Sequence, residues 1–132
     1  MEIDFLQIAD AAEAVNGKLY MLGGGWTRFN APAFPAPVRL AICLGLLVDS
    51  YELDRLRSVT FSLQRDTTKV IPDIRVDVRM SAAANATPVR QRISVVTNTA
   101  FALPGPGVYH LTATVDGLSE FVEFEAVQIL QQ

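Results

Sequence analysis

Apolar and polar residues alternate along much of this 132-residue chain. In the clearest segment, residues 74–80, four apolar side chains alternate with three charged ones. A period of two places successive side chains on opposite faces of a β-strand, so this pattern predicts a strand with one buried and one solvated face. The same alternation runs through residues 59–64, 109–115 and 122–126, and no segment of comparable length has a convincing helical period.

Turn-forming residues separate these segments. Asn16-Gly17 and Asp116-Gly117 are typical of two-residue β-hairpin turns. The three prolines of residues 30–37 exclude a central strand there, because proline lacks the N–H donor, and they predict an extended crossover between two sheets. A second rigid turn is predicted at residues 103–107. The strands that remain number about eight, at residues 3–9, 18–29, 38–48, 57–65, 73–81, 89–99, 107–116 and 120–129.

This pattern predicts an all-β fold, an immunoglobulin-like β-sandwich of about eight mostly antiparallel strands, forming a single domain over residues 1–132. Residues 40–48 are apolar at both even and odd positions, so we expect a central strand or one covered by a partner. Residues 10–15 are rich in alanine and fit either a strand or a helical turn.

Residues 107–111 resemble the tyrosine corner of immunoglobulin-like sandwiches. In that motif a tyrosine near the start of a late strand hydrogen-bonds to backbone a few residues upstream. Tyr109 is the matching residue, and Leu111 stands where antibody domains carry a cysteine. The resemblance therefore concerns the architecture alone and implies no disulfide between the sheets.

A wider resemblance covers nearly the whole chain. It rests on short motifs in a fixed order, which are Ala9-Asp10, Asn16-Gly17-Lys18-Leu19, Gly24-Gly25-Trp26, the proline-containing crossover, Pro104-Gly105-Pro106-Gly107-Val108-Tyr109 and Val115-Asp116-Gly117. This order is similar to that of an uncharacterised family of small bacterial β-sandwich proteins. Membership would support the fold and would supply no catalytic residues.

The composition narrows the function classes. Half of the residues are hydrophobic and 19% are charged, which argues against disorder and leaves apolar side chains for self-association. A net charge of −3 does not attract phosphate backbones. The acidic N-terminus shows no signal peptide, and the longest apolar run is far shorter than the ~20 residues of a membrane helix. We expect a cytoplasmic protein that binds neither nucleic acid nor a membrane.

Few residues carry obvious chemistry. The single cysteine, Cys43, lies in the most apolar segment, and the single histidine, His110, alternates onto an outer face. A single cysteine and a single histidine are too few ligands for an internal zinc site of Cys/His type. Glu123 and Glu125 share a strand face and could serve acid/base chemistry or calcium, although a solvated face is the simpler interpretation.

Two further groups also have simpler interpretations. Three acidic residues after the central strand lack calcium-loop spacing and suit a turn; they are Asp49, Glu52 and Asp54. Four arginines on predicted neighbouring strands could bind nucleic acid, but Asp77 lies between two of them and favours ion pairing; they are Arg75, Arg79, Arg90 and Arg92. We predict no catalytic residue, no metal, no cofactor and no enzymatic activity.

Residues 23–25 are three consecutive glycines, followed by a strand-like segment rather than the Lys-Ser/Thr of a phosphate loop. We favour a bulge or bend that lets the strand change sheets. The functional alternative is a binding platform made of Trp26, Arg28 and Phe29, since Trp and Arg are enriched at interaction hot spots.

Two functions follow from these observations. The first is a non-catalytic interaction or structural module that binds a protein partner or itself, because apolar residues are abundant and edge strands can accept a partner strand. The second is a small-ligand or carbohydrate-binding sandwich, centred on Trp26 and on the carboxylates of residues 123–125. The fold alone decides neither.

Overall fold

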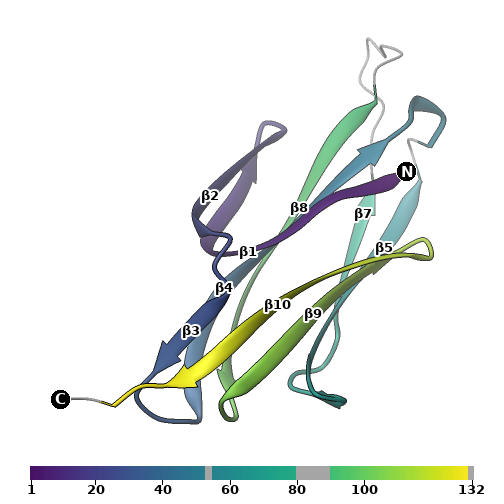
Figure 1. The fold of residues 1–132 in the computed structure, drawn as a ribbon. Coiled ribbons are helices and arrows are strands. Elements are labelled where there is room, and N and C mark those ends of the chain that lie inside the picture. Colours follow the sequence, from purple (N-terminus) through teal and green to yellow (C-terminus); the bar gives the residue numbers. More distant parts are fainter. Residues whose placement is uncertain (53–54, 80–89, 131–132) are drawn as a thin grey trace.

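Two β-sheets pack face to face with the apolar core between them (Figure 1). The computed structural model describes residues 1–52, 55–79 and 90–130. Asp54 and parts of the strands predicted at 73–81 and 89–99 therefore lie outside the described residues. The described elements are β1 (Glu2–Val15), β2 (Lys18–Gly24), β3 (Arg28–Ala31), β4 (Ala36–Val48), the 3-10 helix η1 (Ser50–Glu52), β5 (Leu56–Arg65), β6 (Thr68–Lys69), β7 (Ile74–Arg79), β8 (Gln91–Leu103), β9 (Gly107–Val115) and β10 (Leu118–Gln128).

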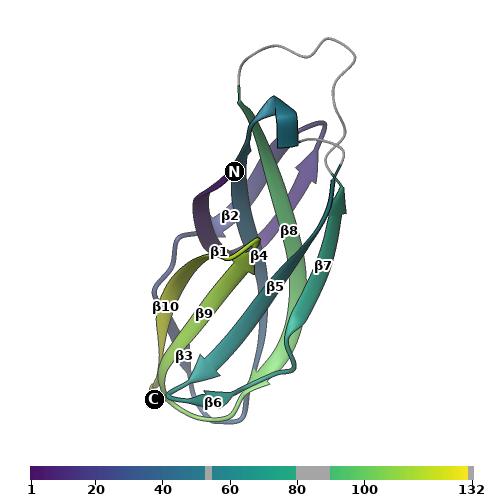
Figure 2. The same cartoon turned by 90° about the vertical axis from the view of Figure 1, so that its right-hand side faces the viewer.

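The first sheet, sheet A, has the strand order β2-β1-β4-β8, and the second, sheet B, has the order β3-β10-β9-β5-β6, with β7 also paired to β5 (Figure 2). The pairs are antiparallel except β3 with β10, which run parallel. The predicted all-β sandwich is confirmed. In the described part of the chain no helix has the length and apolar character needed to cross a membrane.

The two predicted hairpin turns are confirmed. Asn16 and Gly17 have φ values of 51° and 74°, and Asp116 and Gly117 have 48° and 76°. Positive φ at both turn residues matches the twist of the flanking strands, and asparagine, aspartate and glycine tolerate it. These turns join β1 to β2 and β9 to β10.

The described strands number ten rather than eight for two reasons. The segment predicted as one strand at 18–29 is split, with β2 in sheet A and β3 in sheet B. The chain changes sheets at the glycine segment, as predicted: Gly23 and Gly24 end β2 and Gly25 follows it. Gly23 and Gly25 have φ values of 62° and 78°. The second additional strand is the short β6, which pairs with the end of β5. The proline segment then returns the chain from sheet B to sheet A, as expected for a crossover.

The core consists of the side chains that the alternating pattern placed inward. Sheet A contributes mainly from β4, which lies between β1 and β8 as its two-sided apolar pattern predicted. Sheet B contributes from β5, β9 and β10. The largest fully buried side chains include Tyr109, Phe61, Phe124, Ile42 and Leu44.

Tyr109 makes the predicted corner contact. Its hydroxyl donates a hydrogen bond to the Gly105 carbonyl oxygen at 2.6 Å, and its ring stacks on Phe124 with centroids 5.2 Å apart. The tyrosine is fully buried. This contact fixes the turn that carries the chain from β8 in sheet A to β9 in sheet B.

Candidate functional site

The β1–β2 hairpin changes direction halfway along its length. Residues 2–9 of β1 pair with β4, whereas residues 9–15 pair with β2. The change falls at Asp10 and at Gly23, whose positive φ of 62° breaks the regular course of β2. Figure 1 shows β1 turning sharply before it runs beside β2. We call residues 10–24 beyond this bend the arm. The alanine-rich segment 10–15 is therefore strand, which resolves the helix alternative.

The arm folds over the outer face of sheet A. Ala12, Leu19 and Met21 pack against a small cluster of fully buried residues, which are Ala9, Ala41 and Cys43. The Asn98 amide of β8 donates a hydrogen bond to the Ala12 carbonyl oxygen at 3.4 Å. The arm therefore covers the outer face of β4, and burial raises the pKa of the Cys43 thiol.

The opposite face of the arm is open to solvent and carries apolar side chains beside Glu13 and Lys18. The side chains of Val15, Tyr20 and Leu22 are 40%, 54% and 74% exposed. A shallow hollow of about 670 Å³ runs along the hairpin, and residues of both faces of the arm line it: Ala11, Ala12, Glu13, Leu19, Tyr20, Met21 and Leu22. Exposed apolar side chains gathered in this way mark an interaction surface more often than scattered ones do.

Strand β2 is also an edge strand, since β1 is its only neighbour among the described strands of sheet A. Its sequence is KLYMLGG, with Lys18 as the single charged residue. The β7 edge of sheet B, in contrast, carries charges at every second position, and β3 is followed at once by a proline. Charge and proline discourage strand addition, so β2 is less protected than β3 and β7.

Trp26, Arg28 and Phe29 do not share one face. Trp26 and Phe29 are half-buried against the core, with ring centroids 6.3 Å apart. Trp26 also meets Phe124 edge to face at 5.3 Å. Arg28 points to solvent, where its Nε donates to the Asn30 side chain at 3.1 Å. A binding role for these residues stays a prediction.

A second hollow, of about 290 Å³, lies beside Trp26. It forms where the link from β2 to β3 passes between β1 and β10, held by a hydrogen bond from the Gly25 N–H to the Ile8 carbonyl oxygen. Gln7, Thr27 and Glu123 line it together with the indole. Sequence reasoning singled out Trp26 and Glu123 separately, and the structure places both at this hollow.

The other predicted polar positions lie on outer faces. His110 of β9 pairs with Glu123 of β10, with 2.9 Å between Nδ1 and Oε1, and its ring stacks on Phe121. Glu125 is exposed. Within the described residues no group of three or more His, Cys, Asp or Glu side chains is arranged to hold a metal ion.

The expectation that the four arginines occupy neighbouring strands is wrong, because β7 and β8 belong to different sheets. Arg75 pairs with Asp77 at 3.4 Å, and Arg92 pairs with Asp4 at 2.7 Å. The favoured interpretation, ion pairing, is confirmed for these two residues. Arg90 belongs to a larger network at the end of the sandwich.

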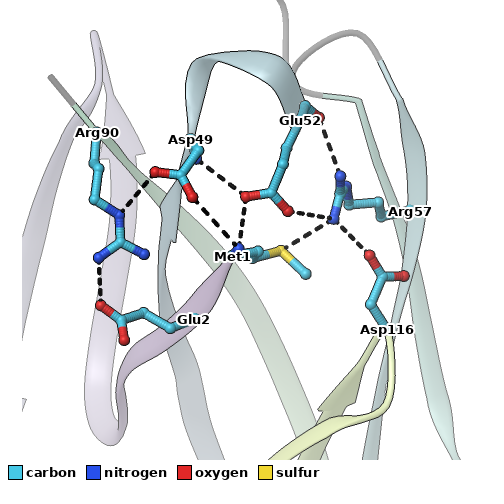
Figure 3. Close-up of polar contacts among 7 residues, drawn as sticks. All are labelled: Met1, Glu2, Asp49, Glu52, Arg57, Arg90 and Asp116. Carbon is cyan, nitrogen blue, oxygen red and sulfur yellow. Dashed lines mark hydrogen bonds and ion pairs between the residues drawn. The ribbon is translucent and has the colours of Figure 1, made fainter. Parts of the chain in front are cut away.

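This network joins segments that are distant in sequence (Figure 3). Arg57 is buried, with its Nη1 bonded to the Asp116 carboxylate at 2.5 Å and its Nη2 bonded to the Glu52 carbonyl oxygen at 3.0 Å. The Glu52 carboxylate accepts from the Met1 α-amino group at 2.5 Å, and Arg90 bridges Glu2 and Asp49. The network thus ties β1, the β4–β5 connection and the β9–β10 turn together.

The hydrogen bond from the Met1 α-amino group is the main reason that the pKa of the Glu52 carboxyl lies below its usual range. The Asp49 N–H and the charge of Arg57 act in the same direction, while burial opposes them. Because nearly all of these charges have partners, the arrangement serves as a structural clamp.

Neither Arg57 nor the arm was predicted from the sequence patterns. Arg57 precedes Val59, Phe61 and Leu63 by even steps, so the alternation itself places it on the buried face. A buried arginine requires an ion-pair partner, and this requirement was the sequence signal that could have identified Arg57. The sequence signal for the bend of the arm was weaker. The glycines at residues 23–25 predict a bend, but they do not indicate the direction in which the chain turns.

The fold and these surfaces define an all-β sandwich with an apolar hairpin arm laid across one sheet. Residues 4–121 match the family described as "Family of unknown function (DUF6941)". The chain belongs to this family. No curated protein matches the sequence.

Proposed function

We propose that this protein is a non-catalytic interaction module of a bacterial cytoplasm that associates with a second copy of itself through the arm. One observation carries the proposal: strand β2 combines an unpaired edge with the exposed side chains of Tyr20 and Leu22. Main-chain groups on such an edge supply affinity, and alternate side chains supply specificity. The apolar composition supports the same function.

The expected association is weak. Burying a leucine or an aromatic side chain fully contributes roughly 1.5–3 kcal/mol, and the arm offers two such side chains per protomer. Association costs about 4–15 kcal/mol in lost translational and rotational freedom. We therefore expect a dimer whose dissociation constant is roughly 1 μM or weaker.

Sedimentation velocity tests this proposal over roughly 1 μM to 1 mM protein. The wild type should shift from monomer to dimer as concentration rises, and Leu22→Arg should remain monomeric because the arginine cannot be buried unpaired. Leu130→Arg is the control, since Leu130 is 93% exposed and lies at the opposite end of the chain. A wild type that stays monomeric throughout, or a Leu22→Arg variant that associates normally, would overturn the proposal.

A second candidate function is the binding of a small polar ligand, such as a sugar, in the hollow beside Trp26. The supporting observation is the combination of an indole with the side chains of Gln7, Thr27 and Glu123 around about 290 Å³. Apolar surface with a few convergent polar groups is the usual make-up of small-molecule sites.

The chain has one tryptophan, so intrinsic fluorescence reports on this hollow directly. Titration with a panel of mono- and disaccharides should change the Trp26 emission for a bound sugar, and Gln7→Ala should weaken that change. Emission that stays constant for every sugar, together with unchanged NMR amide shifts at Thr27 and Glu123, would rule this function out.

A further inference from the structure

Two arginines face the interior of the sandwich from opposite ends of β5. Arg57 and Arg65 both continue the alternation of Val59, Phe61 and Leu63, whose side chains are buried. The guanidinium of Arg57 is bonded within the network of Figure 3. Among the described residues, in contrast, no side-chain hydrogen bond and no ion pair engages the guanidinium of Arg65, which lines a hollow. We infer that Arg65 binds the carboxylate of a small organic acid in this hollow.

The turn at residues 104–107 holds the Arg65 side chain in place. The guanidinium lies over Gly105, where an added Cβ atom would be 2.5 Å from Nη1. The stem lies over Gly107, where an added Cβ atom would be 3.4 Å from Cδ. Tyr109 fixes this turn through its hydrogen bond to the Gly105 carbonyl oxygen. The guanidinium is therefore positioned before a ligand binds, which lowers the entropic cost of binding.

The hollow has a volume of about 350 Å³ and lies between the β5–β6 hairpin and the β8–β9 turn. Figure 2 shows both segments at the same end of the sandwich. Thr68 is paired with Arg65 across the hairpin, so both side chains lie on its inner face. Val70 packs against the core, and Pro104 lines the hollow from the β8–β9 turn. A guanidinium, a hydroxyl and an apolar wall are the usual components of a small-molecule site.

Two neighbouring charges define what the hollow accepts. Lys69 follows Thr68 and therefore points to the outer face of the hairpin, where its Nζ bonds the Asp73 carboxylate at 3.0 Å. It leaves Arg65 as the cation that faces the hollow. Asp66, in the turn of the hairpin, also lines the hollow and brings a negative charge to it. A phosphate, with up to two negative charges, is repelled by Asp66 more strongly than a carboxylate with one.

The ligand class follows from these groups. The planar fork of a guanidinium matches the two oxygens of a carboxylate, with which it forms two parallel hydrogen bonds. Val70 and Pro104 provide the surface for a short apolar chain attached to that carboxylate. Because one charged contact supplies most of the affinity, we expect a dissociation constant of roughly 1–10 mM.

NMR titration of the ¹⁵N-labelled protein tests the site with three probes at constant sodium concentration. Butyrate carries the carboxylate and a short chain, butyramide has the same shape without the charge, and inorganic phosphate has the charge without the chain. Butyrate should shift the amide signals of Thr68, Val70 and Gly105. Butyramide and phosphate should bind roughly 10-fold more weakly or not at all.

Three variants assign the binding to Arg65. Arg65→Met keeps the stem and removes the guanidinium, so it should weaken butyrate binding by about 10-fold or more. Gly105→Ala keeps the arginine but displaces its guanidinium, so it should weaken binding as well. Arg28→Met is the matched control, because Arg28 is exposed and its Nε bonds only the Asn30 side chain. This control should bind butyrate as the wild type does.

Several results would overturn the inference. They are a spectrum that butyrate leaves unchanged, an Arg65→Met protein that binds butyrate as tightly as the wild type, and phosphate or butyramide binding that equals butyrate binding. If Arg65→Met fails to give a dispersed amide spectrum, Gly105→Ala decides the outcome. None of these measurements involves the arm, so the proposed self-association is tested separately.

Discussion

The Tyr109 corner gives the most direct prediction about stability. Tyr109→Phe removes the hydroxyl that bonds the Gly105 carbonyl oxygen at 2.6 Å and leaves the ring, with its stacking on Phe124, in place. Both residues are buried, so the carbonyl oxygen loses its partner away from water. Leaving a buried polar group unsatisfied costs about 1–3 kcal/mol. The substitution should therefore lower the free energy of unfolding by about that amount.

Urea denaturation followed by circular dichroism measures this change. The midpoint should fall with an unchanged m-value, which shows that the folded and unfolded states expose the same surface. Tyr51→Phe is the control, because Tyr51 is 80% exposed, and it should change stability by less than about 0.5 kcal/mol. A Tyr109→Phe protein as stable as this control would refute the view that the hydrogen bond holds the β8–β9 turn.

Three other predictions concern packing and charge. Gly45→Ala places a methyl group on the Phe5 ring and should cost about 1–3 kcal/mol by urea titration; wild-type stability would contradict the packing. Because its folded-state pKa is lowered, Glu52 stabilises the protein above its unfolded pKa of about 4.3, and this contribution is lost as pH falls through the folded pKa. Glu52→Gln should have a lower free energy of unfolding at neutral pH, and this free energy should fall less than that of the wild type on acidification. The same pH dependence in both proteins would contradict this. Met21→Ala should speed labelling of the Cys43 thiol, which the arm buries; equal labelling rates would contradict arm packing.

Patterns within single strands predicted much of the fold. Inward-facing positions such as Val59, Phe61 and Leu63 followed from the period of two, since one face of each strand must be buried. The Asn16-Gly17 turn followed from the conformations that asparagine and glycine permit. Tyr109 followed from a short motif whose hydrogen bond spans only four residues.

Contacts between residues that are distant in sequence could not be predicted from such patterns. The arm bends at Gly23, but its direction depends on the apolar outer face of a strand about twenty residues away in the chain. The Arg57–Asp116 ion pair spans 59 residues. The segment at 18–29 was predicted as one strand that changes sheets at its glycines, but its division into two strands with different partners depends on the strands beside them. Each of these features is decided by which strands become neighbours.

Amide hydrogen exchange at low and high protein concentration tests self-association through the arm most directly. Edge amides exchange readily when they face water and become protected when a partner strand binds them. The account predicts that protection increases with concentration in residues 18–24 and stays constant in β3, β7 and β8. Protection that rises at one of those other edges, or at none, would contradict it.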